Sequence, residues 1–253
     1  MVTHSYPRWE GDVAGAFIER LNLGLTGLGH RLDVVVPADR GTRGSYNHNG
    51  ILVHRAAYGS RGNETLAYTG RMSEALKSPF GIFRFLNLVG GIQREVRRLW
   101  GSGEFDLVHA HWWVPGGLAV VRSGGRPYVL TLHGTDVALL EKIPMVRALA
   151  AGVIRNAAAR TTVSSYLARR AAVFSRLDVS DFEVQPMPPR IELAAEPARG
   201  DAIVTVGRLT KQKRVDVIVR ALSVMKREGH EHSLLVVGDG PERSNLERLA
   251  QAL

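Results

Sequence analysis

The stretch Tyr128-Val129-Leu130-Thr131-Leu132-His133-Gly134 decides the fold class, because a short apolar run ends abruptly in a histidine and a glycine. A run of this length, bounded by turn residues, is typical of a buried β-strand. Similar runs occupy residues 105–111 and 160–163, and a helical stretch follows each of them. We expect loops at 112–117 and 134–136 between strand and helix, whereas Ser164 and Ser165 after the last run are a helix N-cap signal. Strands that alternate with helices predict parallel pairing in a doubly wound α/β sheet.

The beginning of the chain has the same alternation. Residues 2–6 are expected to be the end of a strand, which breaks at Pro7 and enters a loop around Gly11. A helix is predicted over residues 14–28, and the β-branched run 32–37 predicts the next strand. This order is a βαβ unit with a right-handed crossover. Residues 39–63 are polar and rich in glycine, with short apolar runs such as 51–53.

Residues 80–100 predict an amphipathic helix with two interpretations. We expect its apolar stripe to consist of Phe83, Leu86, Val89, Ile92, Val96 and Leu99. The arginines at 94, 97 and 98 lie off or beside that stripe. A basic amphipathic helix can dock on a membrane, whereas a core-facing helix needs only a solvated far side. We favour the core-facing interpretation.

A change of composition near residue 190 predicts a domain boundary. Residues 185–190 are rich in proline, and the following ten are small and acidic without a period. We expect an N-terminal α/β domain over 1–190 and a linker over 191–201. Residues 202–253 then repeat the pattern, with strands at 202–206 and 233–237, helices at 215–228 and 242–253, and an exit loop at 238–241. This second domain is expected to be incomplete.

Composition limits the chemistry. The chain of 253 residues has no cysteine, which excludes disulfides, thiolate metal sites and thiol catalysis. Its net charge is +9, and residues 1–190 hold 23 of the 33 basic but 15 of the 24 acidic residues. Such an excess suits an anionic membrane, a phosphorylated substrate or nucleic acid, or it is a solvated face. Neither a signal peptide nor a membrane span of ~18 apolar residues is evident, so we expect a cytoplasmic protein.

Ligands of open parallel sheets bind beyond the carboxyl ends of the strands, so the residues that follow each strand are the site candidates. Gly11 enters a helix N-terminus, where backbone N–H groups can approach an anion. Arg208 and Lys213 lie between a strand end and a helix start. An arginine fork with a lysine charge suits a diphosphate. The alternatives are a glycine required by the turn and two exposed basic residues.

Histidines follow two other strands. His133 could donate a proton, contact a ligand oxygen or be structural. His109 and His111 are two residues apart and share a face of their strand, but no third metal ligand accompanies them. Trp112 could line a ligand pocket or fill the core. The chain also lacks the Asp-x-Asp motif of a metal-clamped sugar diphosphate.

Four segments in this order resemble glycosyltransferase family 4, the retaining GT-B enzymes. They are Tyr6-Pro7-Arg8-Trp9-Glu10-Gly11-Asp12-Val13-Ala14-Gly15 with Gly29-His30, then Asp106–Trp112 through Leu132–Asp136, then Val206-Gly207-Arg208-Leu209 through Gln212–Asp216, and Val236-Val237-Gly238-Asp239-Gly240-Pro241-Glu242-Arg243. The last two together are specific, and the resemblance spans essentially the whole chain.

The family implies two Rossmann-like domains that face each other across a cleft, with residues 1–190 as the acceptor side and residues 202–253 as the donor-nucleotide-binding domain. It also implies a UDP- or GDP-linked sugar as donor, and no metal or other cofactor. By resemblance, His133 would be the catalytic residue and contact the donor sugar. The other implied roles are donor-diphosphate binding by Arg208, Lys213, Gly11 and Asp12, base and ribose contacts by Gly238, Asp239, Gly240 and Pro241, and an acceptor side with His111, Trp112 and Asp136. The acceptor would be a sugar, a polysaccharide or a lipid-linked sugar. Independently of the family, the basic N-terminal domain and the helix at 80–100 favour a lipid-linked or membrane-proximal acceptor, with peripheral contact with an anionic membrane at the inner face of the plasma membrane.

Departures from the family pattern leave alternatives open. Asp12 stands where a second glycine is usual, and Arg214 replaces the usual glycine after Lys213. The family's Glu-x7-Glu motif would lie after residue 253, so we expect a fragment with little or no activity alone. The first alternative is a GT-B-fold sugar-nucleotide epimerase, which Arg208 and Lys213 fit less well. The second is a non-catalytic fragment that binds a membrane or a partner.

Overall fold

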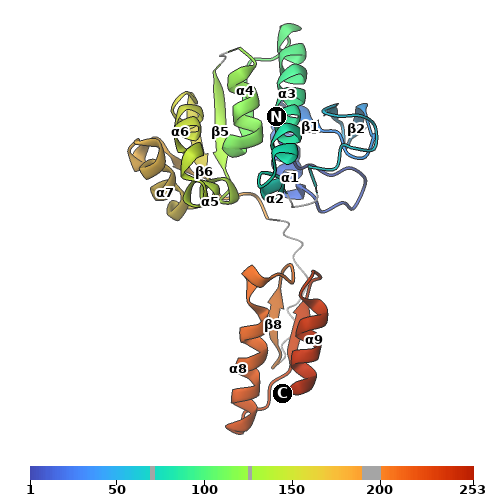
Figure 1. Ribbon diagram of the computed structural model, residues 1–253, viewed down its shortest axis with the longest axis vertical. Helices are drawn as coiled ribbons and strands as arrows, with labels where there is room; N and C mark the ends of the chain where they lie inside the picture. The colour runs from blue at the N-terminus through green and yellow to red at the C-terminus, as the bar shows by residue number, and fades with distance from the viewer. Residues whose placement is uncertain (69–71, 125–126, 190–200) are drawn as a thin grey trace. The chain divides into compact units, whose positions relative to one another are not determined.

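A computed structural model describes residues 1–68, 72–124, 127–189 and 201–253. The chain forms two compact units, which we describe separately: unit 1 is Met1–Ile191 and unit 2 is Glu192–Leu253. Both combine parallel strands with helices (Figure 1). The predicted linker, residues 191–201, lies outside the described residues except for Asp201.

The unit 1 sheet has two parts. The first has the order β1-β3-β2 and the second the order β4-β5-β6-β7. Val2 bridges in parallel to Val35 of the first part and to Ala110 of the second, so the start of the chain joins them. Only Val2 of the predicted strand end 2–6 makes such a bridge. The strands are β1 (Asp33–Pro37), β2 (Gly44–His48), β3 (Ile51–Ala56), β4 (Val108–His111), β5 (Tyr128–Leu132), β6 (Ala159–Thr162) and β7 (Glu183–Val184).

β2 and β3 form a hairpin that the sequence analysis did not predict. β2 pairs antiparallel with β3, and β3 pairs parallel with β1. The turn residues Asn49 and Gly50 both have positive φ, 54° and 81°. Two consecutive positive φ angles are typical of a two-residue hairpin turn, for which Asn-Gly is the preferred pair.

Helices cover the unit 1 sheet (Figure 1). They are α1 (Ala16–Gly27), α2 (Met72–Ala75), α3 (Pro79–Gly101), α4 (Leu118–Arg122), α5 (Thr135–Lys142), α6 (Arg147–Arg155) and α7 (Ser165–Ser175), with the short turns η1 (Trp112–Gly117), η2 (Pro144–Val146) and η3 (Val179–Asp181). Ser164 caps α7 as predicted, and its side chain accepts a hydrogen bond from the Leu167 N–H. The predicted loops at 112–117 and 134–136 are wrong in part, because η1 and the start of α5 follow the strands directly.

Helix α3 corrects the predicted apolar stripe. Phe85 and Leu88 are buried, whereas Phe83 and Leu86, which we had placed on the core side, are exposed. Val89, Ile92 and Val96 are buried as predicted. The first turns of α3 are apolar on every side, so sequence periodicity could not determine which side faces the core.

Unit 2 consists of two parallel strands and two helices. β8 (Ile203–Val206) pairs with β9 (Leu234–Val237). The short turn η4 (Lys211–Lys213) leads into α8 (Val215–Arg227), and α9 (Arg243–Ala252) follows β9. These bounds agree with the predicted elements to within one or two residues.

Candidate active site

Four histidines from three segments gather at the carboxyl edge of the unit 1 sheet; we call His4, His109, His111 and His133 the histidine cluster. The rings of His109 and His111, on one face of β4, stack with their centroids 4.4 Å apart. His133 follows β5, the parallel neighbour of β4, and its Nε2 lies 2.9 Å from Nδ1 of His111. The topology therefore brings strand-end residues 22 positions apart into direct hydrogen-bond contact.

Burial keeps the histidine cluster uncharged. It lowers the pKa of His4 and of His109 to about 4, and that of His133 to about 3. Burial also holds the pKa of His111 well below its ordinary value, and the neighbouring histidines lower it further. Near neutral pH, one nitrogen of the His111–His133 pair must therefore donate and the other accept. His133 would meet a ligand as a neutral hydrogen-bonding group.

The Asp136 carboxylate is hydrogen-bonded to both segments of the site, the one that carries His133 and the one that carries the tryptophans. Its Oδ1 accepts hydrogen bonds from the backbone N–H groups of His133 at 3.1 Å, Gly134 at 2.9 Å and Val137 at 3.0 Å. Its Oδ2 accepts one from the Trp113 N–H at 3.3 Å. Burial raises the pKa of Asp136 to about 6, and the four N–H donors oppose that rise. This carboxylate is buried and fully occupied, so it supports the site rather than facing a ligand.

Aromatic side chains line the same edge. The Trp112 ring lies 4.3 Å from the His133 ring and 4.1 Å from the His4 ring, between centroids. Phe17 of α1 packs 5.4 Å from His133. Trp112 has a φ of 62°, a left-handed conformation that costs a bulky residue about 1–3 kcal/mol. Its indole N–H donates to Thr135 Oγ1 at 3.2 Å, which fixes the ring beside the cluster.

The Gly11 loop is organised by Arg8. The Arg8 guanidinium pairs with Asp12 at 2.7 Å and with Asp39 at 2.7 Å. Burial by itself would raise the pKa of Asp12, but Arg8 and the backbone N–H groups of Arg8 and Ala14 outweigh burial and hold that pKa below its ordinary value. Asp12 is thus already paired, whereas Gly11 is exposed.

In unit 2, the loops that follow β8 and β9 pack backbone against backbone. Leu209 N–H donates to Asp239 O at 2.9 Å, and Glu242 N–H donates to Leu209 O at 3.0 Å. A Cβ atom on Gly238 would lie 2.0 Å from Gly207 O, and one on Gly240 would lie 2.4 Å from Leu209 O. The predicted diphosphate segment and the predicted base and ribose loop therefore form one continuous surface in which these two glycines are required by contact.

The predicted basic pair lies on this surface. Arg208 and Lys213 are both exposed, and a Cβ on Gly207 would lie 4.0 Å from Cε of Lys213, so the lysine side chain reaches back over the end of β8. Arg214 differs from them, because its guanidinium pairs with Asp216 at 3.1 Å. Arg214 also has a φ of 50°, which explains in physical terms why glycine is usual here.

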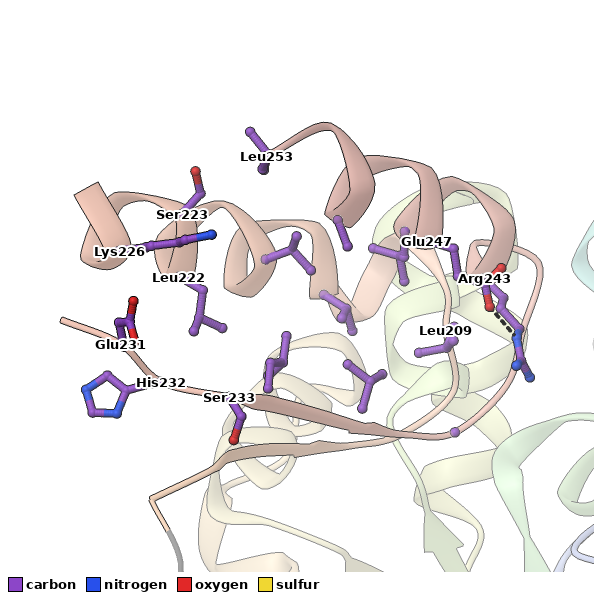
Figure 2. A pocket seen from close by; sticks show the side chains of 17 residues that line it. Leu209, Leu222, Ser223, Lys226, Glu231, His232, Ser233, Arg243, Glu247 and Leu253 are labelled. Atoms are coloured by element: carbon purple, nitrogen blue, oxygen red, sulfur yellow. Dashed lines mark hydrogen bonds and ion pairs between the residues drawn. The ribbon is translucent and has the colours of Figure 1, made fainter. Parts of the chain in front are cut away.

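A hollow of about 820 Å³ in unit 2 lies away from this surface. It is lined mainly by apolar side chains of α8, α9 and β9, including Leu222, Leu234 and Leu246. Figure 2 shows its rim, where Arg243 pairs with Glu247 at 2.9 Å. Gly238 is the one member of the predicted site that lines it. We therefore assign the candidate site to the strand-end loops and not to this hollow.

The structure brings His111, Trp112, His133 and Asp136 together in unit 1, and Arg208, Lys213 and the loop 238–241 together in unit 2. His4 was not among the predicted site residues, although it lies in the predicted strand end 2–6 and follows Val2, which bridges β1 and β4. Within the described ranges, no group of three His, Cys, Asp or Glu side chains is arranged to hold a metal ion. In that same part of the chain, no helix is long and apolar enough to cross a membrane.

Comparison with known proteins agrees with this architecture. The chain matches the catalytic domain of starch synthase IV from Arabidopsis thaliana, solved with ADP and acarbose, with a TM-score of 0.59. That match covers 99% of this chain and 70% of the other at 14% identity, so it supports the fold alone. Unit 1 and unit 2 are thus parts of a GT-B-type α/β fold.

Family comparison identifies the chain more closely. Residues 14–184 match the glycosyl transferase 4-like domain, and residues 194–253 match the glycosyl transferases group 1 domain. The first match covers more than half of the chain, so the chain belongs to the glycosyl transferase 4-like family. The resemblance inferred from the four sequence segments is confirmed.

Three individual relatives share less than 30% sequence identity with this chain. A 2-deoxystreptamine glucosyltransferase of Streptomyces kanamyceticus is 27% identical over an alignment of 186 residues, and the match covers 60% of this chain and 46% of that protein. A GDP-mannose-dependent alpha-(1-6)-phosphatidylinositol monomannoside mannosyltransferase of Mycolicibacterium smegmatis is 28% identical over an alignment of 171 residues, with coverage of 60% of this chain and 44% of that protein. A D-inositol 3-phosphate glycosyltransferase of Salinispora arenicola is 26% identical over an alignment of 196 residues, with coverage of 63% of this chain and 42% of that protein. The chain spans less than half the length of these relatives.

Proposed function

We propose that this chain serves a glycosyltransferase that moves a hexose from a UDP- or GDP-linked donor to an acceptor with retention of configuration. The observation that carries the proposal is the joined pair of strand-end loops in unit 2. There, two exposed basic side chains lie beside a backbone surface that no side chain covers at Gly238 and Gly240. A diphosphate spreads its charge over several oxygens, which an arginine fork and a lysine ammonium can share.

In this proposal Arg208 and Lys213 hold the donor diphosphate. Their positive charge stabilises the nucleoside diphosphate as negative charge develops on it during departure. The loop 238–241 contacts the base and the ribose. Gly11 remains a predicted diphosphate contact through its backbone N–H. Asp12 supports the Gly11 loop through Arg8, because its carboxylate is already paired.

His133 contacts the donor sugar in this proposal. Its Nε2 is hydrogen-bonded to His111, so Nδ1 is the nitrogen to face a sugar hydroxyl. Because burial lowers the pKa of His133 to about 3, the ring acts as a neutral hydrogen-bonding group. Trp112 supports that ring, and the edge of unit 1 that it lines receives the acceptor, which we propose to be a sugar, a polysaccharide or a lipid-linked sugar.

Product analysis tests this function. The chain is incubated with UDP-glucose or GDP-mannose and candidate acceptors, and NMR follows the sugar anomers. Because the chain spans less than half the length of its relatives, the criterion is the identity and configuration of the product and not the rate. We expect an α-linked or free α-hexose, lost in His133→Ala and kept in the exposed-histidine control His30→Ala. An epimerised nucleotide sugar would support the epimerase alternative. The absence of both turnover and nucleotide binding would contradict the proposal.

A further inference from the structure

The first turns of α3 present an apolar surface to solvent. Phe80, Ile82, Phe83 and Leu86 are all exposed, and we call these four residues the Phe83 patch. Phe80 is 69%, Phe83 59% and Leu86 50% exposed. Scattered exposed apolar residues are ordinary, but four within seven positions of one helix, two of them aromatic, mark an interaction surface.

The fold of unit 1 does not need these side chains. The core side of α3 is already supplied by Phe85, Leu88, Val89 and Ile92, which are buried. The helix begins through Ser78, whose side chain accepts a hydrogen bond from the Gly81 N–H, and not through an apolar contact of the Phe83 patch. The patch therefore contributes little to stability, and the cost of exposing it calls for a partner.

Positive charge surrounds the Phe83 patch. No acidic residue occurs between positions 75 and 94 of the sequence. Arg84 donates to Asn63 O and Thr65 Oγ1, Arg94 donates to Ala57 O, and Arg97 donates to the backbone oxygens of Arg122 and Ser123. All of these acceptors are neutral. Within the described residues these three guanidinium groups make no ion pair, so their charge is not compensated.

Helical spacing puts two apolar residues of the patch, Phe83 and Leu86, on one face with Arg94 and Arg97. Positions 83, 86, 90, 94 and 97 recur every three or four residues and so form a single stripe along α3. The stripe is apolar in its first half, where Phe83 and Leu86 lie, and basic in its second half, where Arg94 and Arg97 lie. An amphipathic helix with exposed aromatic residues and arginines binds in the interface of an anionic bilayer.

We propose that the Phe83 patch, with Arg84, Arg94 and Arg97, docks unit 1 on an anionic phospholipid bilayer. Phe80 and Phe83 enter the boundary between headgroups and acyl chains, and the three arginines contact lipid phosphates. Charge complementarity selects a lipid surface over a second copy of this chain, because a second copy would bring the same positive charges together.

The patch lies at the site edge of unit 1. A crossover helix runs antiparallel to the parallel strands it connects, so the N-terminus of α3 lies at the carboxyl edge of the sheet. Consistent with this, Arg94 contacts Ala57, the first residue after β3 ends. The histidine cluster occupies the same edge. Docking would thus bring that edge toward a lipid-linked acceptor, a consequence that rests on the proposed function, whereas the docking itself does not.

Vesicle co-sedimentation of the full chain tests the proposal. Vesicles of phosphatidylcholine with about one third phosphatidylglycerol are compared with pure phosphatidylcholine. We expect Phe83→Ser with Leu86→Ser to lower partitioning into the anionic vesicles at least about tenfold, since two large apolar side chains no longer leave water. Arg94→Gln with Arg97→Gln should lower it by about tenfold or more. The matched control is Met145→Ser with Leu149→Ser, two side chains that are 92% and 49% exposed on η2 and α6.

Circular dichroism establishes that each variant is folded, which is expected because all substituted side chains are exposed. Unchanged partitioning of the control would support the assignment. The proposal is overturned if the wild-type chain does not bind anionic vesicles, if it binds neutral vesicles equally well, or if the control loses as much binding as the Phe83 pair. A dimer that the Phe83 pair abolishes, without vesicle binding, would assign the patch to self-association. Nucleotide binding, measured by titration with UDP and GDP, tests the proposed function. Because that measurement does not depend on vesicles, a failure of docking does not contradict the proposed function.

Discussion

Acid should destabilise unit 1 through the histidine cluster. The folded pKa values of His4 and His109 are about 4 and that of His133 is about 3, against 6.5 for an unperturbed histidine. Between pH 6.5 and the folded values, the unfolded chain binds more protons than the folded chain. The free energy of unfolding is therefore highest above pH 6.5 and falls as the pH decreases through that window.

The magnitude follows from these values. At about pH 5.5, each of the three histidines lowers the free energy of unfolding by slightly more than about 1 kcal/mol relative to pH 8, or about 4 kcal/mol together. Asp136 acts in the opposite direction, because its folded pKa of about 6 exceeds the ordinary 3.8. It raises the free energy of unfolding by about 1 kcal/mol at the same pH. The buried Met1 amino group, whose pKa burial lowers from 8.0 to about 6, adds to the loss. A net loss of at least about 3 kcal/mol is a large part of the stability of a domain.

Urea unfolding followed by tryptophan fluorescence measures this loss. All four tryptophans lie in unit 1, so the signal reports on that unit. His109→Gln keeps a group that can hydrogen-bond to Thr131 and removes one titrating ring, so it should reduce the pH dependence of the free energy of unfolding by about 1 kcal/mol. His30→Gln, at an exposed position, is the control. A loss below about 1 kcal/mol, or an equal effect of the control, would refute the reasoning.

Three further predictions concern single contacts. Gly238→Ala should destabilise unit 2 by about 2 kcal/mol or more, because its Cβ would meet Gly207 O; an unchanged thermal transition by circular dichroism would contradict this. Asp136→Ala removes the acceptor of four backbone N–H groups and should lower the free energy of unfolding of unit 1 by about 3 kcal/mol, measured with urea. A decrease no larger than that of an exposed Asp→Ala variant would show that these four hydrogen bonds do not stabilise the unit. Arg8→Ala should raise the pKa of Asp12 in an NMR titration, while Arg31→Ala should leave it unchanged; no change with Arg8→Ala would show that Arg8 does not control Asp12.

Much of the fold follows from local sequence. The parallel strands of both units are short apolar runs closed by turn residues, and the Ser164 cap was evident from its position after β6. Strand ends also predicted which side chains would meet, because parallel topology brings consecutive carboxyl ends to one edge. For this reason the contact between His111 and His133 was implicit in the sequence.

Other features could not be derived in the same way. The exposed Phe83 and Leu86 follow from tertiary packing, since the apolar start of α3 offers the core more than one side. The β2–β3 hairpin did have a local signal, Asn49-Gly50, which a polar and glycine-rich context concealed. His4 joins the cluster because the start of the chain bridges β1 and β4. The sequence indicated a strand end at residues 2–6, but not its position between these two strands.

Calorimetric titration of the chain with UDP and GDP tests the proposal that Arg208 and Lys213 form a nucleoside diphosphate site. We expect one nucleotide to bind, and Arg208→Ala and Lys213→Ala each to weaken binding about tenfold or more through loss of a charge-assisted contact. Lys211→Ala, an exposed lysine of the same loop, should leave binding unchanged. Binding of neither nucleotide, or equal weakening by all three substitutions, would contradict the account.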